Sequence, residues 1–275
     1  MKLFDAFRYD GKRVLVVGGA SGMGAATAQL VQDAGAEVVV WDYAEVTLDG
    51  VKGVHVNLSD RDSIDNALEQ TGGTFDALFC CAGVADGTPG IERINFIGHR
   101  YVIDRLLERD ALPRGSAIGM ISSAAGLAWE VNLPTFQGLL DATEWDDAVA
   151  WVEKNSKADY MSMKLTMCAY VASQAYPLLK RGIRINAICP GPTDTPLAQA
   201  NKEMWLGFGA DYRGEVGVEA SSPLEQAFPL VFLCSEAAAA LSGQTIVSDM
   251  GYLAAGLTNA YEPAAPVASF LIYNR

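Results

Sequence analysis

Tyr160 and Lys164 lie four residues apart in Asp159-Tyr-Met-Ser-Met-Lys164, at the start of a predicted helix over residues 158–180. Side chains at this spacing share one helix face, about a turn apart. A phenol has an ordinary pKa of about 10, and a nearby ammonium group favours the phenolate and lowers that pKa. The pair therefore has the chemistry to move a proton to or from a substrate oxygen.

Two further polar side chains could complete this group. Ser123 ends the run Ile121-Ser-Ser123 after a predicted strand, and its hydroxyl could hold a substrate oxygen by a hydrogen bond. Asn95 lies in a predicted helix, where an amide side chain is otherwise a mediocre choice. Because Tyr-x-x-x-Lys alone is common by chance, the hypothesis of an acid–base site depends on these neighbours.

A second signal lies between Arg13 and Asp42, where a buried strand, a glycine-rich turn, a helix and a second strand ending in a carboxylate follow one another. Glycines at 18, 22 and 24 allow a tight turn and a close approach of a pyrophosphate to the backbone. The phosphates would sit on the free N–H groups at the start of the helix. This arrangement predicts a dinucleotide site.

Asp42 also indicates which dinucleotide binds. Its carboxylate can accept hydrogen bonds from both ribose hydroxyls of an adenosine, whereas it would repel a 2′-phosphate. The turn and the positions directly after Asp42 contain no Arg or Lys to offset that repulsion. We therefore expect NAD in preference to NADP.

Apolar runs rich in Val, Ile and Leu alternate with helical stretches along the chain. Strands are predicted near residues 13–18, 36–41, 53–57, 75–81, 116–122, 183–189 and 244–248, and helices at 22–34, 60–70, 92–109, 158–180 and 223–239. Several strand runs are apolar throughout, as expected for parallel strands covered on both faces. The pattern predicts an α/β protein with a single doubly wound Rossmann domain over residues 1–275, with about seven parallel strands and helices on both faces.

Two long stretches interrupt this alternation, residues 124–157 and residues 192–221. Insertions at the carboxyl ends of parallel strands are where such folds bind ligands. The aromatic residues of these inserts could line a substrate pocket or only attach the inserts to the core, and both could be true. The residues predicted to line the pocket are Trp129, Met204, Trp205 and Phe208.

Composition narrows the classes of function. Half of the residues are hydrophobic and 19% are charged, which is typical of a globular protein, and the net charge of −13 argues against nucleic acid and anionic membrane surfaces as partners. No run approaches the length of a membrane span. Five scattered cysteines are typical of a reduced, cytoplasmic protein, and no spacing resembles a metal site.

Three further segments, Cys80-Cys-Ala-Gly83, Pro190-Gly-Pro-Thr193 and Ile246-Val-Ser-Asp-Met-Gly251, complete a pattern with those above. Together they resemble the short-chain dehydrogenase/reductase family over essentially the whole chain. The family's Thr-Gly-x-x-x-Gly-x-Gly turn matches residues 17–24 with Val17 in place of threonine. Its Asn-Asn-Ala-Gly element keeps only Ala82 and Gly83.

The resemblance implies roles for individual residues. Tyr160 would exchange a proton with the substrate oxygen, Ser123 would steady that oxygen, Lys164 would hold the nicotinamide ribose and lower the pKa of Tyr160, and Asn95 would position a water that relays the proton to solvent. The cofactor contacts predicted from the motifs and the resemblance are Gly18, Ser21, Gly22, Met23, Gly24, Asp42, Asn57, Leu58, Ala82, Gly83, Tyr160, Lys164, Pro190, Gly191, Thr193 and Thr195.

The long interval between Ser123 and Tyr160 resembles the bacterial 3α-hydroxysteroid dehydrogenase/carbonyl reductase subgroup and the similar coniferyl-alcohol dehydrogenases. The resemblance implies an NAD-dependent oxidoreductase for a hydrophobic secondary alcohol or its ketone, with a hydroxysteroid as the first hypothesis. The alternatives are an aryl or allylic alcohol dehydrogenase and, more remotely, a regulator that senses NAD without turnover. We expect a homo-oligomer, either a dimer or a tetramer, in which the apolar tail Ala264–Ile272 covers either a core edge or a partner subunit.

Overall fold

The computed structural model describes residues 2–273, and its centre is one sheet of seven parallel strands in the order β3-β2-β1-β4-β5-β6-β7. The strands are β1 (Arg13–Val17), β2 (Glu37–Asp42), β3 (Lys52–His55), β4 (Ala77–Cys80), β5 (Ala117–Ile121), β6 (Arg184–Pro190) and β7 (Gln244–Ser248). Each strand agrees with a predicted one to within two residues at either end. The chain order reverses beside β1, and ligands bind at such a point in doubly wound sheets.

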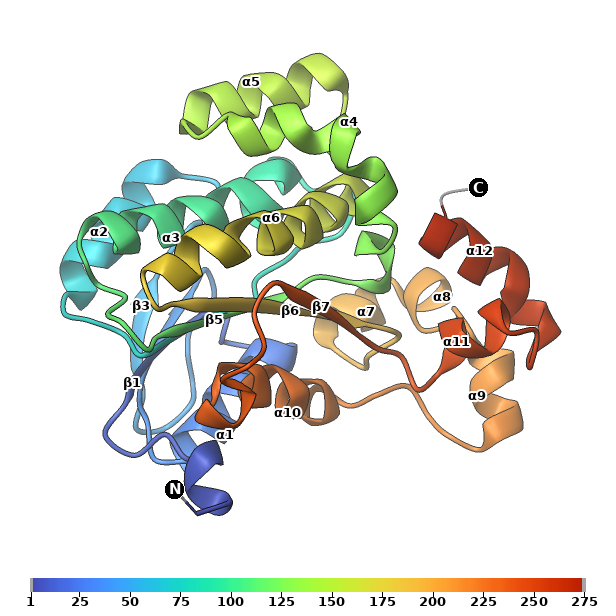
Figure 1. The fold of residues 1–275 in the computed structure, drawn as a ribbon, viewed down its shortest axis with the longest axis horizontal. Coiled ribbons are helices and arrows are strands. Elements are labelled where there is room, and N and C mark those ends of the chain that lie inside the picture. The colour runs from blue at the N-terminus through green and yellow to red at the C-terminus, as the bar shows by residue number, and fades with distance from the viewer. Residues whose placement is uncertain (1, 274–275) are drawn as a thin grey trace.

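Helices cover both faces of the sheet (Figure 1). One face carries α2 (Arg61–Thr71), α3 (Gly98–Glu108) and α6 (Tyr160–Lys180), and the other carries α1 (Gly22–Asp33) and α10 (Pro223–Cys234). Along β1, Leu15 and Val17 belong to one buried cluster and Val14 and Val16 to the other. The predicted double burial of the strands and the doubly wound architecture are confirmed.

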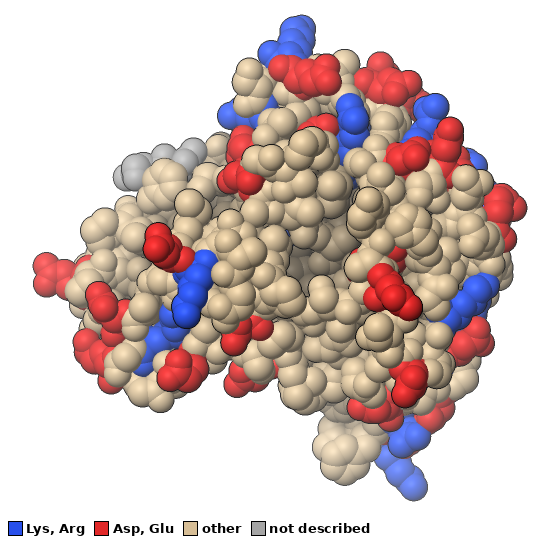
Figure 2. Space-filling model, turned by 180° about the vertical axis from the view of Figure 1, so that it is seen from behind, with Lys and Arg blue, Asp and Glu red and all other residues tan. Residues whose placement is uncertain are grey.

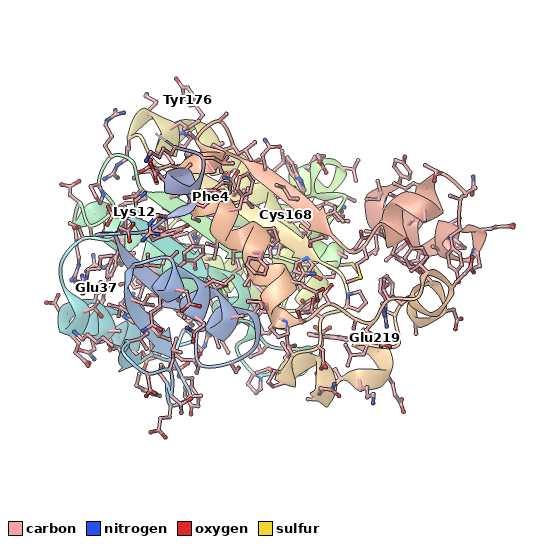
Figure 3. The ribbon with its side chains drawn as sticks, turned by 90° about the horizontal axis from the view of Figure 1, so that it is seen from below. Phe4, Lys12, Glu37, Cys168, Tyr176 and Glu219 are labelled. Atoms are coloured by element: carbon pink, nitrogen blue, oxygen red, sulfur yellow. The ribbon has the colours of Figure 1, made fainter. Side chains whose placement is uncertain are left out.

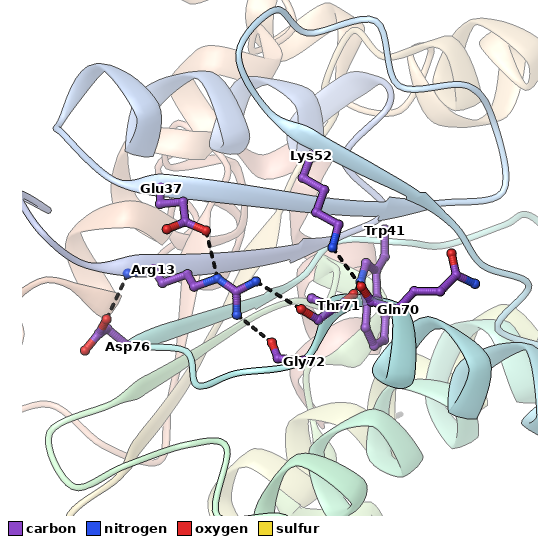
Figure 4. Close-up of polar contacts among 8 residues, drawn as sticks. All are labelled: Arg13, Glu37, Trp41, Lys52, Gln70, Thr71, Gly72 and Asp76. Atoms are coloured by element: carbon purple, nitrogen blue, oxygen red, sulfur yellow. Dashed lines mark hydrogen bonds and ion pairs between the residues drawn. The ribbon is translucent and has the colours of Figure 1, made fainter.

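Arg13 ties the amino end of β1 to its surroundings, as Figure 4 shows. Its guanidinium group pairs with Glu37 at 2.9 Å and donates hydrogen bonds to the carbonyls of Thr71 and Gly72 at the end of α2. On the neighbouring strand, the indole N–H of Trp41 donates to the Thr71 hydroxyl at 2.8 Å. The Arg13 contacts fix β1, β2 and α2 at the edge opposite to the carboxyl ends of the strands, and Trp41 joins the later part of β2 to the end of α2.

Two of the predicted helices agree with the structure to within one residue at either end, and the other three differ in extent or in type. The segment 92–109 begins with a π-helical turn, η2 (Arg93–Ile97), before α3. The helix at 158–180 begins at Tyr160, because the Asp159 side chain caps it by accepting from the Ser162 N–H. The helix at 223–239 ends at Cys234, because Ser235 is extended; a short 3₁₀ turn, η4 (Glu236–Ala238), follows.

The two inserts are helical. Residues 124–157 form η3 (Ala124–Gly126), α4 (Trp129–Asp141) and α5 (Trp145–Asn155), and α4 and α5 lie outside α3 and α6 as an additional layer (Figure 1). Residues 192–221 form the short helices α7 (Pro196–Ala200), α8 (Lys202–Trp205) and α9 (Ala210–Val216). These gather with α11 (Tyr252–Leu257) and α12 (Ala265–Tyr273) at one end of the molecule.

The apolar tail forms the short turn η5 (Glu262–Ala264) and then α12, which packs on α11. Ala264 and Ala268 are fully buried in a small cluster with Leu127, Cys189 and Leu253. The tail therefore covers a core edge of its own chain. At the other end of the chain, η1 (Phe4–Phe7) places the ring of Phe7 on Phe232 of α10.

Among the helices in residues 2–273, none combines the length and the apolar composition needed to cross a bilayer. Acidic side chains are spread over the face seen in Figure 2, with basic side chains between them and no continuous basic patch.

Candidate active site

A groove of about 530 Å³ runs along the carboxyl ends of β1, β2 and β4. The glycine turn forms its floor. Gly18 has φ +86°, and a Cβ there would collide with Ala82, while a Cβ at Gly24 would collide with the Gly18 carbonyl. Gly22, with φ +55°, opens α1. The groove thus offers exposed backbone and a helix N-terminus, the arrangement that receives a pyrophosphate.

Asp42 lies at the end of β2 and lines this groove. Its Oδ2 accepts the Ala20 N–H at 2.8 Å, and its Oδ1 accepts the Ala44 N–H at 2.9 Å. Both carboxylate oxygens retain a further lone pair, so they can also accept from hydroxyl groups. No Lys or Arg occurs among the described residues that line the groove.

The remaining walls of the groove come from three other segments. Asn57 and Leu58 follow β3, and the Asn57 Oδ1 accepts both the N–H and the hydroxyl of Ser59 at 3.0 and 2.8 Å. Ala82 and Gly83 follow β4, and Thr195 caps α7 close to Gly22. The predicted cofactor residues that line the groove together are Gly18, Ser21, Gly22, Met23, Gly24, Asp42, Asn57, Leu58, Ala82, Gly83 and Thr195.

Sequence reasoning missed part of the lining. Trp41 and Tyr43, the chain neighbours of Asp42 at the end of β2, also line the groove, and their adjacency to that acid could have indicated them. Ser59, Val84, Thr88, Pro89, Ile94, Pro196 and Leu197 also line the groove. No local pattern distinguishes these residues, which come from loops and from the helical segments η2 and α7. Five predicted contacts do not line this groove: Tyr160 and Lys164 on α6, and Pro190, Gly191 and Thr193 at and after the end of β6.

Lys164 is almost fully buried, with 3% of its surface exposed, and its Nζ donates to the Ile121 carbonyl at 2.8 Å. Burial lowers its pKa to about 8, against the opposing influence of the neighbouring cysteines, of which Cys168 is the strongest. The Nζ lies 5.5 Å from the centre of the Tyr160 ring. The predicted pair is therefore together on one face of α6.

Tyr160 is half-buried, and its pKa is raised to about 12. Burial is the main cause, a hydrogen bond with Ser123 lowers the pKa, and the charge of Asp86 raises it. The expectation that Lys164 would bring this pKa below the ordinary value was wrong for the protein alone, because the cost of burying the phenolate exceeds the favourable contacts. Ser123 also accepts the Ala125 N–H at 3.1 Å, so its own proton is available to a neighbour.

Asn95 lies in the π-helical turn and is fully buried. Its Oδ1 accepts the Val84 N–H at 2.8 Å and its Nδ2 donates to the Val84 carbonyl at 2.9 Å. The side chain therefore holds the turn after β4. The implied role of Asn95 in positioning a water stays a prediction.

The four residues predicted to line the pocket differ in what they contact. The ring of Trp205 lies 5.1 Å from the ring of Tyr160. Phe208 packs edge-on against Tyr252 at 5.0 Å, and Trp129 packs against the same apolar cluster. Met204 is 75% exposed. Phe208 and Trp129 thus attach their segments to the core, whereas Trp205 covers Tyr160.

All five cysteines are free thiols. Cys80 and Cys81 face opposite sides of the sheet, as expected for adjacent strand residues, and burial raises the pKa of both thiols. Cys168 lies in the interior (Figure 3), with its sulfur 3.7 Å from that of Cys189. Among the described residues, no group of three or more His, Cys, Asp or Glu side chains is arranged to hold a metal.

Comparison with known proteins decides the family. The family model described as short chain dehydrogenase matches residues 12–127, and the model described as enoyl-(acyl carrier protein) reductase matches residues 146–253. Cis-4-hydroxycyclohexanecarboxylate dehydrogenase from Sinomonas cyclohexanicum is 30% identical over 262 residues, covering 88% of this chain and 97% of that protein. The chain belongs to the short-chain dehydrogenase/reductase family. The resemblance inferred from its motifs is confirmed.

Other short-chain dehydrogenases are similarly related. The 3-alpha-hydroxysteroid dehydrogenase/carbonyl reductase of Comamonas testosteroni is 30% identical over 86% of this chain and 95% of its own. Coniferyl-alcohol dehydrogenase from a Pseudomonas strain is 28% identical over 87% and 96%. The crystal structure of the 3-alpha-hydroxysteroid dehydrogenase from Pseudomonas sp. B-0831 with NADH has a TM-score of 0.71 at 25% identity, covering 90% of this chain and 99% of that one.

Short-chain dehydrogenases are oxidoreductases that use a nicotinamide cofactor on small substrates. The groove fits such a dinucleotide, since the glycine turn leaves the space that a Cβ would fill and the carboxylate of Asp42 borders the groove.

Proposed function

We propose that this protein is an NAD-dependent oxidoreductase that interconverts a hydrophobic secondary alcohol and its ketone. The observation that carries the proposal is that Tyr160, Lys164 and Ser123 lie together, with the Lys164 Nζ against Gly83 in the wall of the dinucleotide groove. The preference for NAD is supported by Asp42 and by the lack of basic side chains among the described residues of the groove lining. A 2′-phosphate there would meet an unbalanced negative charge.

When bound, the nicotinamide supplies or accepts the hydride. Tyr160 exchanges the proton of the substrate oxygen, and the Ser123 hydroxyl holds that oxygen by a hydrogen bond. Since the pKa of Tyr160 is about 12 in the protein alone, the phenol is protonated at neutral pH and is suited to donate a proton to a ketone. The buried ammonium of Lys164 beside the ring supports the phenolate that remains after transfer.

The groove residues divide between the two ends of the cofactor. Gly18, Gly22 and Gly24 would take the pyrophosphate, and Asp42 would accept the adenosine ribose hydroxyls. Asn57 and Leu58 would meet the adenine. Lys164 would hold the nicotinamide ribose, while Pro190, Gly191 and Thr193 would border the nicotinamide amide. The Thr193 hydroxyl donates to the Gly191 carbonyl at 3.0 Å, which orders this segment.

A hydrophobic, ring-containing substrate fits the ring of Trp205 over Tyr160. Hydroxysteroids are the first hypothesis, supported by the similarity to 3-alpha-hydroxysteroid dehydrogenases. Aryl or allylic alcohols are the second, supported by the similarity to coniferyl-alcohol dehydrogenase. A regulator without turnover is the remaining alternative, and the filled catalytic positions disfavour it.

The single continuous sheet supports one domain over residues 1–275. Exposed apolar side chains on α6, α10 and β7 support a homo-oligomer, either a dimer or a tetramer; Tyr176 (Figure 3), Phe228 and Val247 are examples. The five free thiols support a cytoplasmic location.

The function is tested by measuring NADH or NADPH formation by absorbance with NAD or NADP. The substrate panel contains 3-hydroxysteroids, benzylic and allylic alcohols and small secondary alcohols. Turnover of one class with NAD would support the proposal, and turnover with NADP alone would contradict the cofactor assignment. The Asp42→Ala variant should lower the ratio of NAD to NADP activity by about tenfold or more, because it removes a charged hydrogen-bond acceptor. An unchanged ratio would count against the ribose contact.

A further inference from the structure

The turn Ala82–Val84 after β4 lies between the cofactor groove and Lys164. All three of its residues line the groove. From the other side, a Cβ at Gly83 would lie 3.7 Å from the Lys164 Nζ and 3.5 Å from the Asn95 Oδ1, so the backbone is in ordinary contact with both. A displacement of this turn would therefore move one wall of the groove and loosen the packing around Lys164.

Side-chain hydrogen bonds from one helical segment hold this turn. The Asn95 side chain accepts from the Val84 N–H and donates to the Val84 carbonyl, as described above. His99, four residues later on the same helix face, contacts the Ala82 carbonyl through its Nε2 at 2.9 Å. Cys80 and Cys81, at the end of β4, bring only thiols, which are weak donors. The strong donor to Ala82 thus comes from α3.

The tautomer of His99 follows from its partner. A carbonyl oxygen can only accept, so the Nε2 carries the proton. The imidazole is fully buried, and burial lowers its pKa to about 4, with the charge of Lys164 acting in the same direction. The Nδ1 is buried without a hydrogen-bond partner among the described residues. Burying the Nδ1 without a partner costs free energy of folding, which an apolar side chain at this position would avoid. The presence of an imidazole therefore indicates a specific use for its Nε2.

We propose that His99 is a positioning residue that fixes the Ala82–Val84 turn between the cofactor and Lys164, by donating from its Nε2 to the Ala82 carbonyl. The link to the cofactor rests on the function proposed above, whereas the hold on the turn is a property of the protein alone. The role requires a donor at the Nε2 position and does not require titration of the ring.

The first test measures amide hydrogen exchange of peptides covering residues 80–86 in the protein without cofactor, using four variants. His99→Phe keeps a planar ring and removes the donor. His99→Asn places its amide nearer the helix and cannot reach Ala82, whereas His99→Gln places an N–H donor near the Nε2 position. Ile103→Val, one turn further along α3 and also fully buried, is the packing control.

We expect exchange in residues 80–86 to be about tenfold faster in the Phe and Asn variants, because a buried hydrogen bond to the turn is lost. The Gln variant and Ile103→Val should stay close to the wild type. Equal acceleration in all four variants would mean general loosening and would overturn the proposal. No acceleration in the Phe and Asn variants, or the same acceleration in the Gln variant as in Phe, would also overturn it.

The second test measures the dissociation constant of NADH by its fluorescence. We expect about tenfold weaker binding for His99→Phe, with partial recovery in His99→Gln. Unchanged binding in the Phe variant would overturn the link between the turn and the cofactor. If the wild type bound neither NADH nor NADPH, the proposed function would be overturned, and the exchange measurement would still decide the role of His99.

Discussion

The two inserts follow neighbouring strands and are both rich in aromatic residues, yet they are held in different ways. In residues 124–157, Trp145 is buried edge-on against Tyr101 at 5.4 Å, and Arg100 donates to the carbonyls of Leu139 and Ala142. In residues 192–221, three short helices have no buried apolar side chain larger than Ala198. We call residues 124–157 the brace, because buried contacts fix them to the core. We call residues 192–221 the cover, because they have few buried apolar side chains and place Trp205 over Tyr160.

The difference shows that aromatic content does not by itself identify a substrate pocket. The brace uses its rings to bind its own protein, through pairs such as Phe136 and Trp151. The cover brings Trp205 against Tyr160, the residue that carries the proposed chemistry. We therefore expect changes in the brace to alter stability and changes in the cover to alter turnover.

We expect the largest effect on turnover from a change at Tyr160, which the cover contacts through Trp205. Tyr160→Phe removes the proton donor, and kcat should fall by about 10²–10⁴-fold. The dissociation constant of NADH, measured by fluorescence, should stay nearly unchanged, because the ring and its packing remain. Activity within twofold of the wild type would contradict the assignment of Tyr160 as acid and base.

The brace is tested by Arg100→Met, which removes both hydrogen bonds to the end of α4 and keeps an apolar stem. The free energy of unfolding, measured by urea denaturation, should fall by about 2–4 kcal/mol, because one buried and one partly buried carbonyl lose a charged donor. Arg105→Met on the same helix removes only partly exposed ion pairs with Asp65 and Glu108, and should cost less than about 1 kcal/mol. An equal loss of free energy of unfolding in the two variants would contradict the inference that the contacts of Arg100 with the brace are important for stability.

The cover is tested by Trp205→Ala, which exposes the Tyr160 ring to water. We expect KM for the hydrophobic alcohol to rise by about tenfold, because a large apolar contact is lost. Burial raises the pKa of Tyr160, so exposure should lower that pKa and shift the acid limb of the pH–rate profile for alcohol oxidation, where Tyr160 must be deprotonated, to lower pH. An unchanged KM and pH profile would show that the ring does not cover the site.

The smallest effect concerns Asp104, near Arg100 on α3. Burial raises its pKa to about 6, against the favourable charge of Arg100. The folded state therefore binds more protons than the unfolded state between about pH 4 and 6, and stability should fall as pH rises through that range. Asp104→Asn should flatten this dependence and raise stability at pH 7 by about 1 kcal/mol. Urea denaturation at pH 4.5 and pH 7 measures the pH dependence of stability and the stability at pH 7. An equally steep pH dependence in the variant would contradict Asp104 as its cause.

Local patterns were sufficient to predict the sheet, the glycine turn and the start of α10 at residue 223. At Ser222 and Glu225, for example, the reciprocal capping hydrogen bonds involve residues three apart. The proposed catalytic residues Tyr160 and Lys164 could be paired because they are four residues apart on one helix. The difference between the inserts could not be predicted, because it depends on contacts such as Arg100 with Leu139 and Trp205 with Tyr160, which join residues far apart in the chain. The pKa of Tyr160 was mispredicted for the same reason, since burial is a property of the assembled fold.

The strand order also bears on how the chain assembles as it is synthesised. The strands from β4 to β7 join the sheet in chain order, so each new strand covers the edge left by the one before it. Among these strands, the longest interval of synthesis separates β5 from β6, because residues 122–183, including the whole brace, lie between them. During that interval β5 presents an unpaired apolar edge to the solvent. The stage before β6 emerges is therefore where newly made chains are most exposed to aggregation.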